Sequence, residues 1–174
     1  MFYGLHYLHD EEIVHGNIKP VRSYGTSHGL ICSPTNFSQT NILVDFDGTA
    51  VLCDYGLQTL LHDIRIPFQS IRYIAPELRQ NDNGVFQCSY EGDIWAFGCV
   101  SIKIMRGERP YRTIQDETEI LGTEAQAYTT DILQYIKSSE ILGCLNTSPE
   151  KRSTLEEIRE WVEFGSHGHS ESMH

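Results

Sequence analysis

The residues of this chain best suited to chemistry lie in its first third. The stretch His15-Gly16-Asn17-Ile18-Lys19-Pro20 places an imidazole, a carboxamide and an amine close together in sequence. Asp54 follows a short apolar run and is itself followed by an aromatic residue and a glycine. A carboxylate offers the hard oxygen ligand that Mg²⁺ prefers. A neutral carboxamide such as that of Asn17 cannot take up a proton near pH 7, so it cannot act as a general base.

The bulk composition bounds the classes of protein to consider. The 174 residues are 40% hydrophobic and 21% charged, which fits one globular domain with a core of its own. A net charge of −11 argues against nucleic acid and against an anionic membrane as partners, because phosphate surfaces repel an acidic chain. We find no apolar run long enough to span a bilayer and no signal peptide in residues 1–10, so we expect the cytoplasm or the nucleus as the compartment.

The cysteines and the terminal histidines do not indicate a metal site. The five cysteines are scattered, without a C-x-x-C pair, and we interpret them as free, mostly buried thiols rather than as a disulfide or zinc site: Cys32, Cys53, Cys88, Cys99 and Cys144. Residues 165–174 are rich in Ser, Gly and His, and we expect a disordered tail. We interpret His167 and His169 as part of that loose end.

Two elements must position the stretch that begins at His15. Residues 1–14 are predicted to end a helix and run into a loop or short strand, with an apolar face that includes Leu5 and Leu8. Residues 41–56 are predicted to form two short strands, since apolar runs flank the turn signal Asp47-Gly48.

Three further helices are predicted later in the chain. Residues 89–106 are apolar almost all round, including Ile104, so we expect a buried helix that begins at Ser89 or Tyr90. A helical pattern runs from about residue 129 to 137. The segment 154–164 is predicted to be amphipathic, with Leu155, Ile158, Trp161 and Val162 on one face.

Five motifs in this order resemble a eukaryotic protein kinase, over nearly the whole chain. His15 to Pro20, continued by Thr40-Asn41, resembles the catalytic loop H-R-D-L-K-P-x-N, and Asp54-Tyr55-Gly56 resembles D-F-G. Ala75-Pro76-Glu77 matches A-P-E, and the stretch from Ser89 resembles S-x-x-x-D-x-W-x-x-G. The stretch from Cys144 to Thr154 resembles C-L-x-x-D-P-x-x-R-P-T. Among kinases, the phrases look nearest to the tyrosine-kinase-like branch of Ser/Thr kinases.

The resemblance implies an α+β, mainly α-helical fold, the larger C-terminal lobe of a kinase, over residues 1–164. It also implies a small β-hairpin between the catalytic loop and the D-Y-G stretch. The smaller lobe of the family carries G-x-G-x-x-G and V-A-I-K motifs that cover and hold the nucleotide. Neither motif occurs in this sequence, so we expect the N-lobe, and with it the roof of the ATP site, to be absent.

The resemblance also assigns roles to residues. Asn17 stands at the position of the catalytic Asp, and Lys19 at that of the phosphate-neutralising Lys. Asn41 and Asp54 stand where the family holds Mg²⁺ and the phosphates of ATP, so ATP and Mg²⁺ are the implied cofactors, with binding in doubt without the N-lobe. Gly16 replaces the usual Arg of the family motif.

Other matched positions are expected to be structural, among them His15 and Tyr55, which replaces the family's Phe. Asp93 is expected to accept hydrogen bonds from the catalytic-loop backbone, a role compatible with helix capping, and Arg152 is expected to pair with Glu77. Residues 57–77 correspond to the activation segment. Its hydroxyls at Thr59 and Ser70 are interpreted as ordinary loop residues, with phosphorylation as the alternative.

A block of residues, 21–39, interrupts the catalytic-loop match. Its removal leaves Lys19-Pro20-Thr40-Asn41, and its 19 residues correspond to 57 in-frame nucleotides (19 × 3). Val21-Arg22 and Gln39 can be encoded by splice-site-like sequences, and Thr35-Asn36 by a branch-point sequence. We hypothesise a translated short intron. The alternative is a genuine surface insertion, which costs little closure entropy. Complementary DNA that uniformly retains the 57 nucleotides would exclude the intron.

Three functions are compatible with these residues. The first is a truncated, catalytically impaired pseudokinase that acts, if at all, as a binding module for an unidentified protein. The second is a fragment of an active Ser/Thr kinase that transfers the γ-phosphate of ATP to protein hydroxyls. The third is a non-functional pseudogene product that aggregates through its exposed lobe interface. Asn17 favours the first.

Overall fold

The computed structural model describes residues 1–20, 41–44, 47–56, 71–79, 88–121, 128, 132 and 136–164. Helices dominate the described residues, together with one two-stranded sheet, so the predicted α+β, mainly helical class is confirmed. The elements in chain order are α1 (Phe2–Asp10), β1 (Ile42–Val44), β2 (Ala50–Leu52), the 3₁₀ turns η1 (Ile71–Tyr73) and η2 (Pro76–Leu78), α3 (Tyr90–Arg106), α4 (Glu117–Leu121), α6 (Ser139–Cys144), the 3₁₀ turn η3 (Pro149–Lys151) and α7 (Leu155–Phe164).

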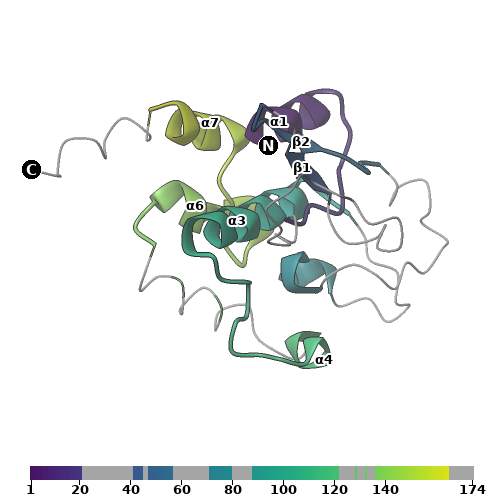
Figure 1. Ribbon diagram of the computed structural model, residues 1–174, viewed down its shortest axis with the longest axis vertical. Helices are drawn as coiled ribbons and strands as arrows, with labels where there is room; N and C mark the ends of the chain where they lie inside the picture. Colours follow the sequence, from purple (N-terminus) through teal and green to yellow (C-terminus); the bar gives the residue numbers. More distant parts are fainter. Residues whose placement is uncertain are drawn as a thin grey trace, which may run out of the picture.

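Helix α3 forms the centre of the fold, with α1 and the hairpin above it, α6 beside it and α4 below in the view of Figure 1. The hydroxyl of Ser89 caps it by accepting the Gly92 backbone N–H (3.0 Å), so the helix begins as predicted and Asp93 is not its cap. Gly107 ends it in the left-handed conformation (φ 72°). Burial continues only as far as Ile102. The expectation for Ile104 was wrong: 70% of this side chain is exposed, because the last turn projects beyond the core.

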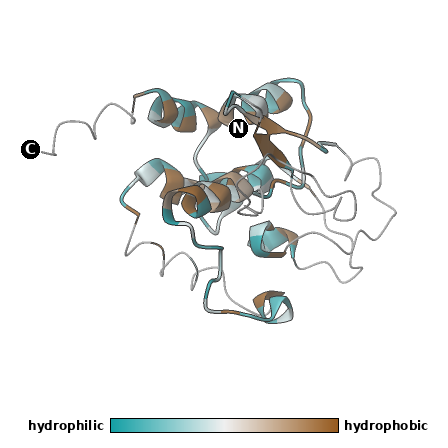
Figure 2. Ribbon diagram, in the orientation of Figure 1, coloured by the Kyte–Doolittle hydropathy of each residue, from teal (hydrophilic) through white to brown (hydrophobic). Residues whose placement is uncertain are grey.

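Helix α1 and the hairpin pack together beside α3. Phe2, Leu5 and Leu8 make the buried face of α1, as the apolar spacing predicts. The strands pair antiparallel, with Ile42 opposite Leu52, which confirms the predicted hairpin. Figure 2 shows both strands as predominantly hydrophobic.

In the C-terminal part of the described chain, α6 packs against α3, and α7 packs against α6 and α1. Ile158 is fully buried, and the other residues of its predicted face pack against the core, so the amphipathic helix is confirmed. Thr154 and Glu157 form a capping box at its start, in which the Thr154 N–H donates to the Glu157 carboxylate (2.8 Å). The helix predicted over 129–137 ends earlier than expected: Ile132 is helical, whereas residues 136 and 137 are not.

Several expectations concern thiols, metals and segments at the edges of the described structure. Cys99 and Cys144 are buried, Cys53 and Cys88 half-buried, and all of these thiols are free. Within the described ranges, no cluster of three or more His, Cys, Asp or Glu residues could hold a metal, and no helix is long and apolar enough to cross a membrane. The block 21–39, Cys32, Thr59, Ser70 and the tail 165–174 lie outside the described residues.

Candidate functional site

A single buried carboxylate holds the loop that begins at His15. Asp93, on the first turns of α3, accepts the backbone N–H of His15 (2.7 Å) and of Gly16 (2.8 Å) with its two oxygens. His9 of α1 places its Nε2 3.0 Å from one of the same oxygens. Charge-assisted bonds of this kind are among the stronger ones in proteins. The role expected for Asp93 therefore agrees with the geometry, and His9 joins it as a residue that the motifs did not identify.

His15 is fully buried beneath this loop. Its Nδ1 accepts the backbone N–H of Asn17 (3.4 Å), a bond that requires the ring nitrogen to be unprotonated. Burial lowers the pKa of His15, although the negative charge of Asp93 opposes the shift. A neutral imidazole is thus part of the loop's internal support.

Asn41 lies against the same loop despite the residues that separate them in sequence. Its Nδ2 donates to the backbone carbonyl of Asn17 (2.5 Å), and its own N–H donates to the carbonyl of Lys19 (3.4 Å). The Cys53 N–H donates to the Asn41 carbonyl (3.0 Å), which joins the start of β1 to the residue before Asp54. The interposed block therefore does not displace Asn41 from the site, and the side chain keeps its carbonyl oxygen as an acceptor.

Lys19 and Asp54 bring opposite charges to the site. Only 5% of Lys19 is exposed, and burial lowers its pKa while the charge of Asp54 partly offsets that effect. Asp54 is exposed and has a left-handed backbone (φ 60°). Tyr55, next to it, is 51% exposed. A large aromatic ring facing solvent here indicates a surface left uncovered by the described residues.

Together, these contacts bring five of the predicted site residues into one region: His15, Asn17, Lys19, Asn41 and Asp54. Behind the loop, between it, η2 and α3, lies a void of about 30 Å³ lined by Gly16, Asn17 and Asp93 among others. A space of this size has room for one or two water molecules. The void cannot take a nucleotide.

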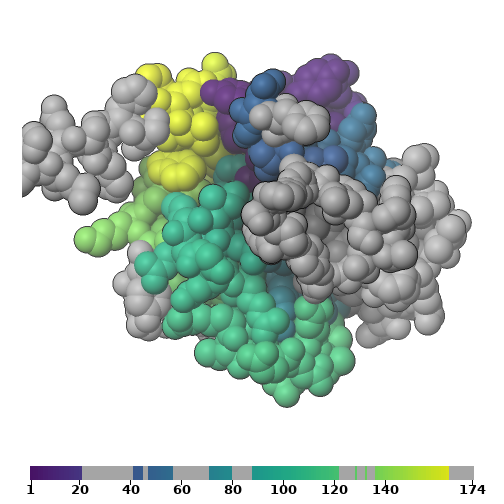
Figure 3. Space-filling model, in the orientation of Figure 1, coloured from purple at the N-terminus to yellow at the C-terminus, as the bar shows by residue number. Residues whose placement is uncertain are grey.

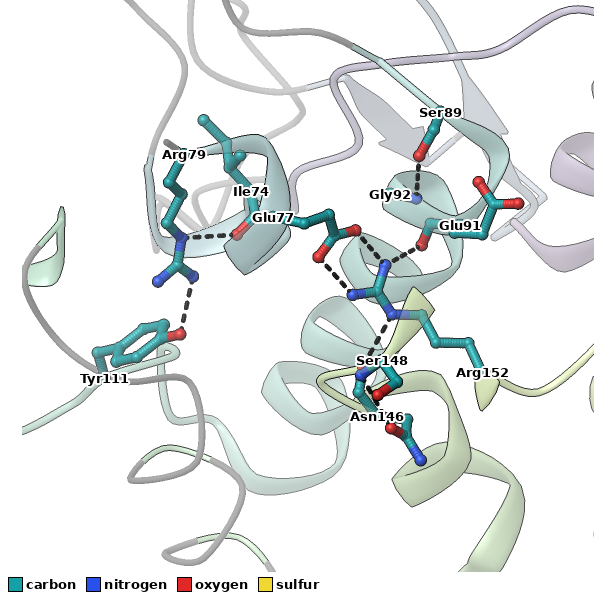
Figure 4. Close-up of polar contacts among 10 residues, drawn as sticks. All are labelled: Ile74, Glu77, Arg79, Ser89, Glu91, Gly92, Tyr111, Asn146, Ser148 and Arg152. Atoms are coloured by element: carbon teal, nitrogen blue, oxygen red, sulfur yellow. Dashed lines mark hydrogen bonds and ion pairs between the residues drawn. The ribbon is translucent and has the colours of Figure 1, made fainter. Parts of the chain in front are cut away.

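The predicted ion pair between Glu77 and Arg152 is present (Figure 4). The guanidinium donates to both carboxylate oxygens of Glu77 at 2.7 Å, and also to the carbonyls of Glu91 (2.7 Å) and Asn146 (2.9 Å). The Arg152 side chain is 1% exposed and its guanidinium stacks on Trp95, 5.1 Å from the ring centroid. This bidentate pair ties η2 to the loop before α7.

Two other arginines hold the same region and were not singled out by the motifs. Arg72 donates to the carbonyls of Pro110 and Tyr111 (both 3.0 Å) and to that of Ile114 (2.8 Å). Arg79 donates to the Ile74 carbonyl (2.9 Å) and to the Tyr111 hydroxyl (2.7 Å), as Figure 4 shows.

The donor atoms fit a magnesium ion only in part. The Asp54 carboxylate and the Asn41 side-chain carbonyl are hard oxygen donors on adjoining segments, and Mg²⁺ in proteins is commonly held by one or two such ligands together with substrate phosphates. Asn41 and Asp54 are therefore the residues that would hold the ion. The position of the general base lacks the group that the reaction needs, because the neutral carboxamide of Asn17 cannot accept a proton near pH 7.

Comparison with known sequences identifies the class of protein. The family described as protein kinase domain matches residues 37–162, most of the chain, so the chain belongs to the protein kinase domain family. The match begins within the block 21–39, after the loop from His15 to Pro20.

Several individual relatives are MAP kinase kinase kinases. The chain is 28% identical over 171 residues to MAP kinase kinase kinase mkh1 of Schizosaccharomyces pombe, covering 91% of this chain and 13% of that protein. It is 30% identical to mitogen-activated protein kinase kinase kinase 9 of Arabidopsis thaliana and 32% identical to number 3, each over 89% of this chain. It spans 18% and 25% of those two proteins, so it corresponds to a fraction of each relative's length.

Proposed function

We propose that this chain is a catalytically impaired kinase-domain protein that acts in signalling by binding another protein. The observation that supports the proposal is Asn17 at the base position of a loop whose backbone is held by Asp93 and Asn41. In the family, a carboxylate at this position orients the substrate hydroxyl and accepts its proton. Loss of a general base costs about 10²–10⁴-fold in rate.

The support for a binding role is that the structural contacts remain while the base does not. The Asp93 bonds, the Asn41 bonds and the Glu77–Arg152 pair are all made. These contacts cost entropy to form and stabilise the fold, and none of them performs chemistry. The contacts that hold the fold are thus made, although the general base is replaced. Such a chain can still offer a folded surface to another protein, which is what a binding role requires.

For the nucleotide, the proposal is that Mg²⁺–ATP binds weakly at most. When bound, ATP supplies the transferable phosphoryl group, and Asp54 and Asn41 would hold the ion at its phosphates. Lys19 would contribute positive charge beside them, since its amine lies within the electrostatic reach of Asp54. The family's Gly-rich loop and strand lysine do not occur in this sequence.

The test is a paired measurement on the purified chain. Thermal unfolding is followed with and without millimolar Mg²⁺–ATP, and transfer of labelled phosphate to casein is measured in the same samples. We expect little or no shift in Tm and no transfer. The matched control is Asp54→Asn, which removes the magnesium carboxylate: transfer by the original chain that disappears in this variant would establish genuine kinase activity and overturn the proposal.

A further inference from the structure

A groove separates α6 from α7 on the side of the fold away from the hairpin. It has a volume of about 780 Å³ and is lined by α6, the loop before α7 and one face of α7. Figure 1 places the two helices beside one another at one side of α3, and Figure 3 shows α7 (yellow) at the surface next to α1 (purple). The volume lies within the usual range of about 300–1,000 Å³ for ligand sites.

Helix α7 presents a second, acidic and aromatic stripe to this groove. Glu157, Glu160, Trp161 and Phe164 line it at helical spacing i, i+3, i+4 and i+7, so they share one face. Ile158 points instead into the core. Phe164, the last residue of α7, is 72% exposed. The stripe thus carries two carboxylates in its first part and two aromatic rings towards the end of α7. Trp161 is half-buried and also packs against the core, whereas Glu157, Glu160 and Phe164 are exposed.

The opposite wall of the groove is also acidic. Glu140 and Glu150 line it from α6 and from η3. Hydrogen bonds from its own backbone N–H and from the hydroxyls of Ser139 and Ser138 lower the pKa of Glu140, so this carboxylate stays ionised in mildly acidic solution.

The cations of the lining do not neutralise these carboxylates. Arg152 lines the groove, but its guanidinium is directed inward to Glu77 and to the carbonyl of Glu91. Lys151 is the remaining cation among the described lining residues. Four carboxylates therefore face the groove against one exposed ammonium group: those of Glu140, Glu150, Glu157 and Glu160.

We propose that this groove, which we call the α6–α7 groove, is a docking site for a basic peptide segment of another protein. Lysine or arginine side chains of the segment would pair with the carboxylates and lie over the rings of Trp161 and Phe164. An apolar residue between the cations would cover the exposed ring of Phe164. The proposal deepens the binding role proposed above and rests on it.

The test uses the full chain and a fluorescein-labelled synthetic peptide of repeated Lys-Leu-Lys-Ser units, with fluorescence anisotropy as the readout. The matched probe has Glu in place of Lys. We expect the Lys peptide to bind at least about tenfold more tightly than the Glu peptide, and to be weakened as salt rises from about 0.05 to 0.5 M.

Three variants locate the binding. Glu160→Lys reverses a charge in the groove, Phe164→Ala removes the exposed ring, and Glu11→Lys makes the same charge change at the exposed end of α1. We expect the first two to raise the Kd about fivefold each, and Glu11→Lys to change it less than about twofold. Circular dichroism checks that each variant is folded.

Two results would overturn the proposal. The first is equal weakening by Glu11→Lys and Glu160→Lys, which would mean nonspecific attraction to an acidic chain. The second is a dimer in sedimentation that Phe164→Ala converts to monomer, which would make a second copy of the chain the occupant. Failure of the docking proposal can be told apart from failure of the proposed function. Asp54-dependent phosphate transfer would overturn the proposed function and would leave peptide binding at the groove unaffected.

Discussion

At the scale of single residues, the loop from His15 to Lys19 is held mainly through its backbone. Asp93 accepts N–H groups at positions 15 and 16, and Asn41 donates to the carbonyl at position 17. The side chain of residue 17 and the shape of the loop are therefore separate properties. Gly16 contributes by a different route, since its backbone is left-handed (φ 75°).

Gly16→Ala is expected to destabilise the chain by about 1 kcal/mol, because a Cβ is disfavoured at positive φ. The matched control is Gly4→Ala on α1, where an added Cβ would meet Leu52 at an ordinary 3.5 Å. That change should be neutral or stabilise by up to about 1 kcal/mol. Urea unfolding of both variants measures the difference, and equal effects would show that the left-handed backbone is not what matters.

The buried His15 predicts a pH dependence of stability. Its folded-state pKa is lowered by burial, so the unfolded chain binds the proton more readily. Stability is then fully present above the unfolded pKa of about 6.5 and is lost as pH falls below it towards the folded value. His15→Gln should flatten the slope of unfolding free energy against pH below about 6.5, measured by urea titration. An unchanged slope would assign the dependence to other histidines.

At the scale of elements, the ion pair between Glu77 and Arg152 joins η2 to the loop before α7. Glu77 is 27% exposed at its side chain, whereas Arg152 is 1% exposed. Loss of the carboxylate therefore leaves a buried guanidinium without its charge partner.

Glu77→Ala is expected to lower the free energy of unfolding by about 3 kcal/mol. Its control is Glu156→Ala, which removes an exposed pair with Arg159 (3.4 Å) and should cost less than about 1 kcal/mol. Chemical denaturation compares the two. A loss as small as the control's would mean that water screens the Glu77 pair.

Elements with local signals were predictable, and contacts between distant side chains were not. The Asp47-Gly48 turn, the capping hydroxyl at Ser89 and the apolar face around Ile158 each follow from neighbouring residues. Arg72 instead satisfies carbonyls at positions 110–114, and no local pattern marks such a partnership. The predicted end of the helix over 129–137 was wrong. The apolar spacing continues to Ile136, but this residue is buried without being helical.

The candidate site was likewise predictable only in part. Its residues could be found from motif order, which is why Asn17, Lys19, Asn41 and Asp54 were predicted together. Their closeness across the block 21–39 could not be read from spacing, because it depends on the long-range bonds of Asn41. On α7 the sequence analysis predicted only the apolar face around Ile158; the carboxylates that line the groove were not identified from the sequence.

At the scale of the whole molecule, the described residues on either side of the interposed block lie next to each other. The Asn41 N–H donates to the Lys19 carbonyl (3.4 Å). Both readings of the block, a translated intron and a surface insertion, remain predictions. The geometry shows only that the fold on either side of the block is continuous in space.

Deletion of residues 21–39 is accordingly expected to preserve the fold. Because Lys19 and Asn41 are held together, removal of the 19 residues relieves roughly 2–3 kcal/mol of closure entropy, so Tm should stay the same or rise by several degrees. Scanning calorimetry of the deleted and full chains makes the comparison. A clear fall in Tm would show that the block packs as part of the domain.

The two hydrogen bonds that Asp93 accepts from the loop backbone also bear on how the chain could evolve. They involve N–H groups, which almost every amino acid possesses, so they form equally well with Asp or Asn at position 17. In an ancestor with Asp at position 17, a single nucleotide change could replace it with Asn. The loop would keep these backbone hydrogen bonds, so we expect no loss of stability from the exchange. The chemistry of position 17 can therefore change while the backbone hydrogen bonds that shape the loop are kept.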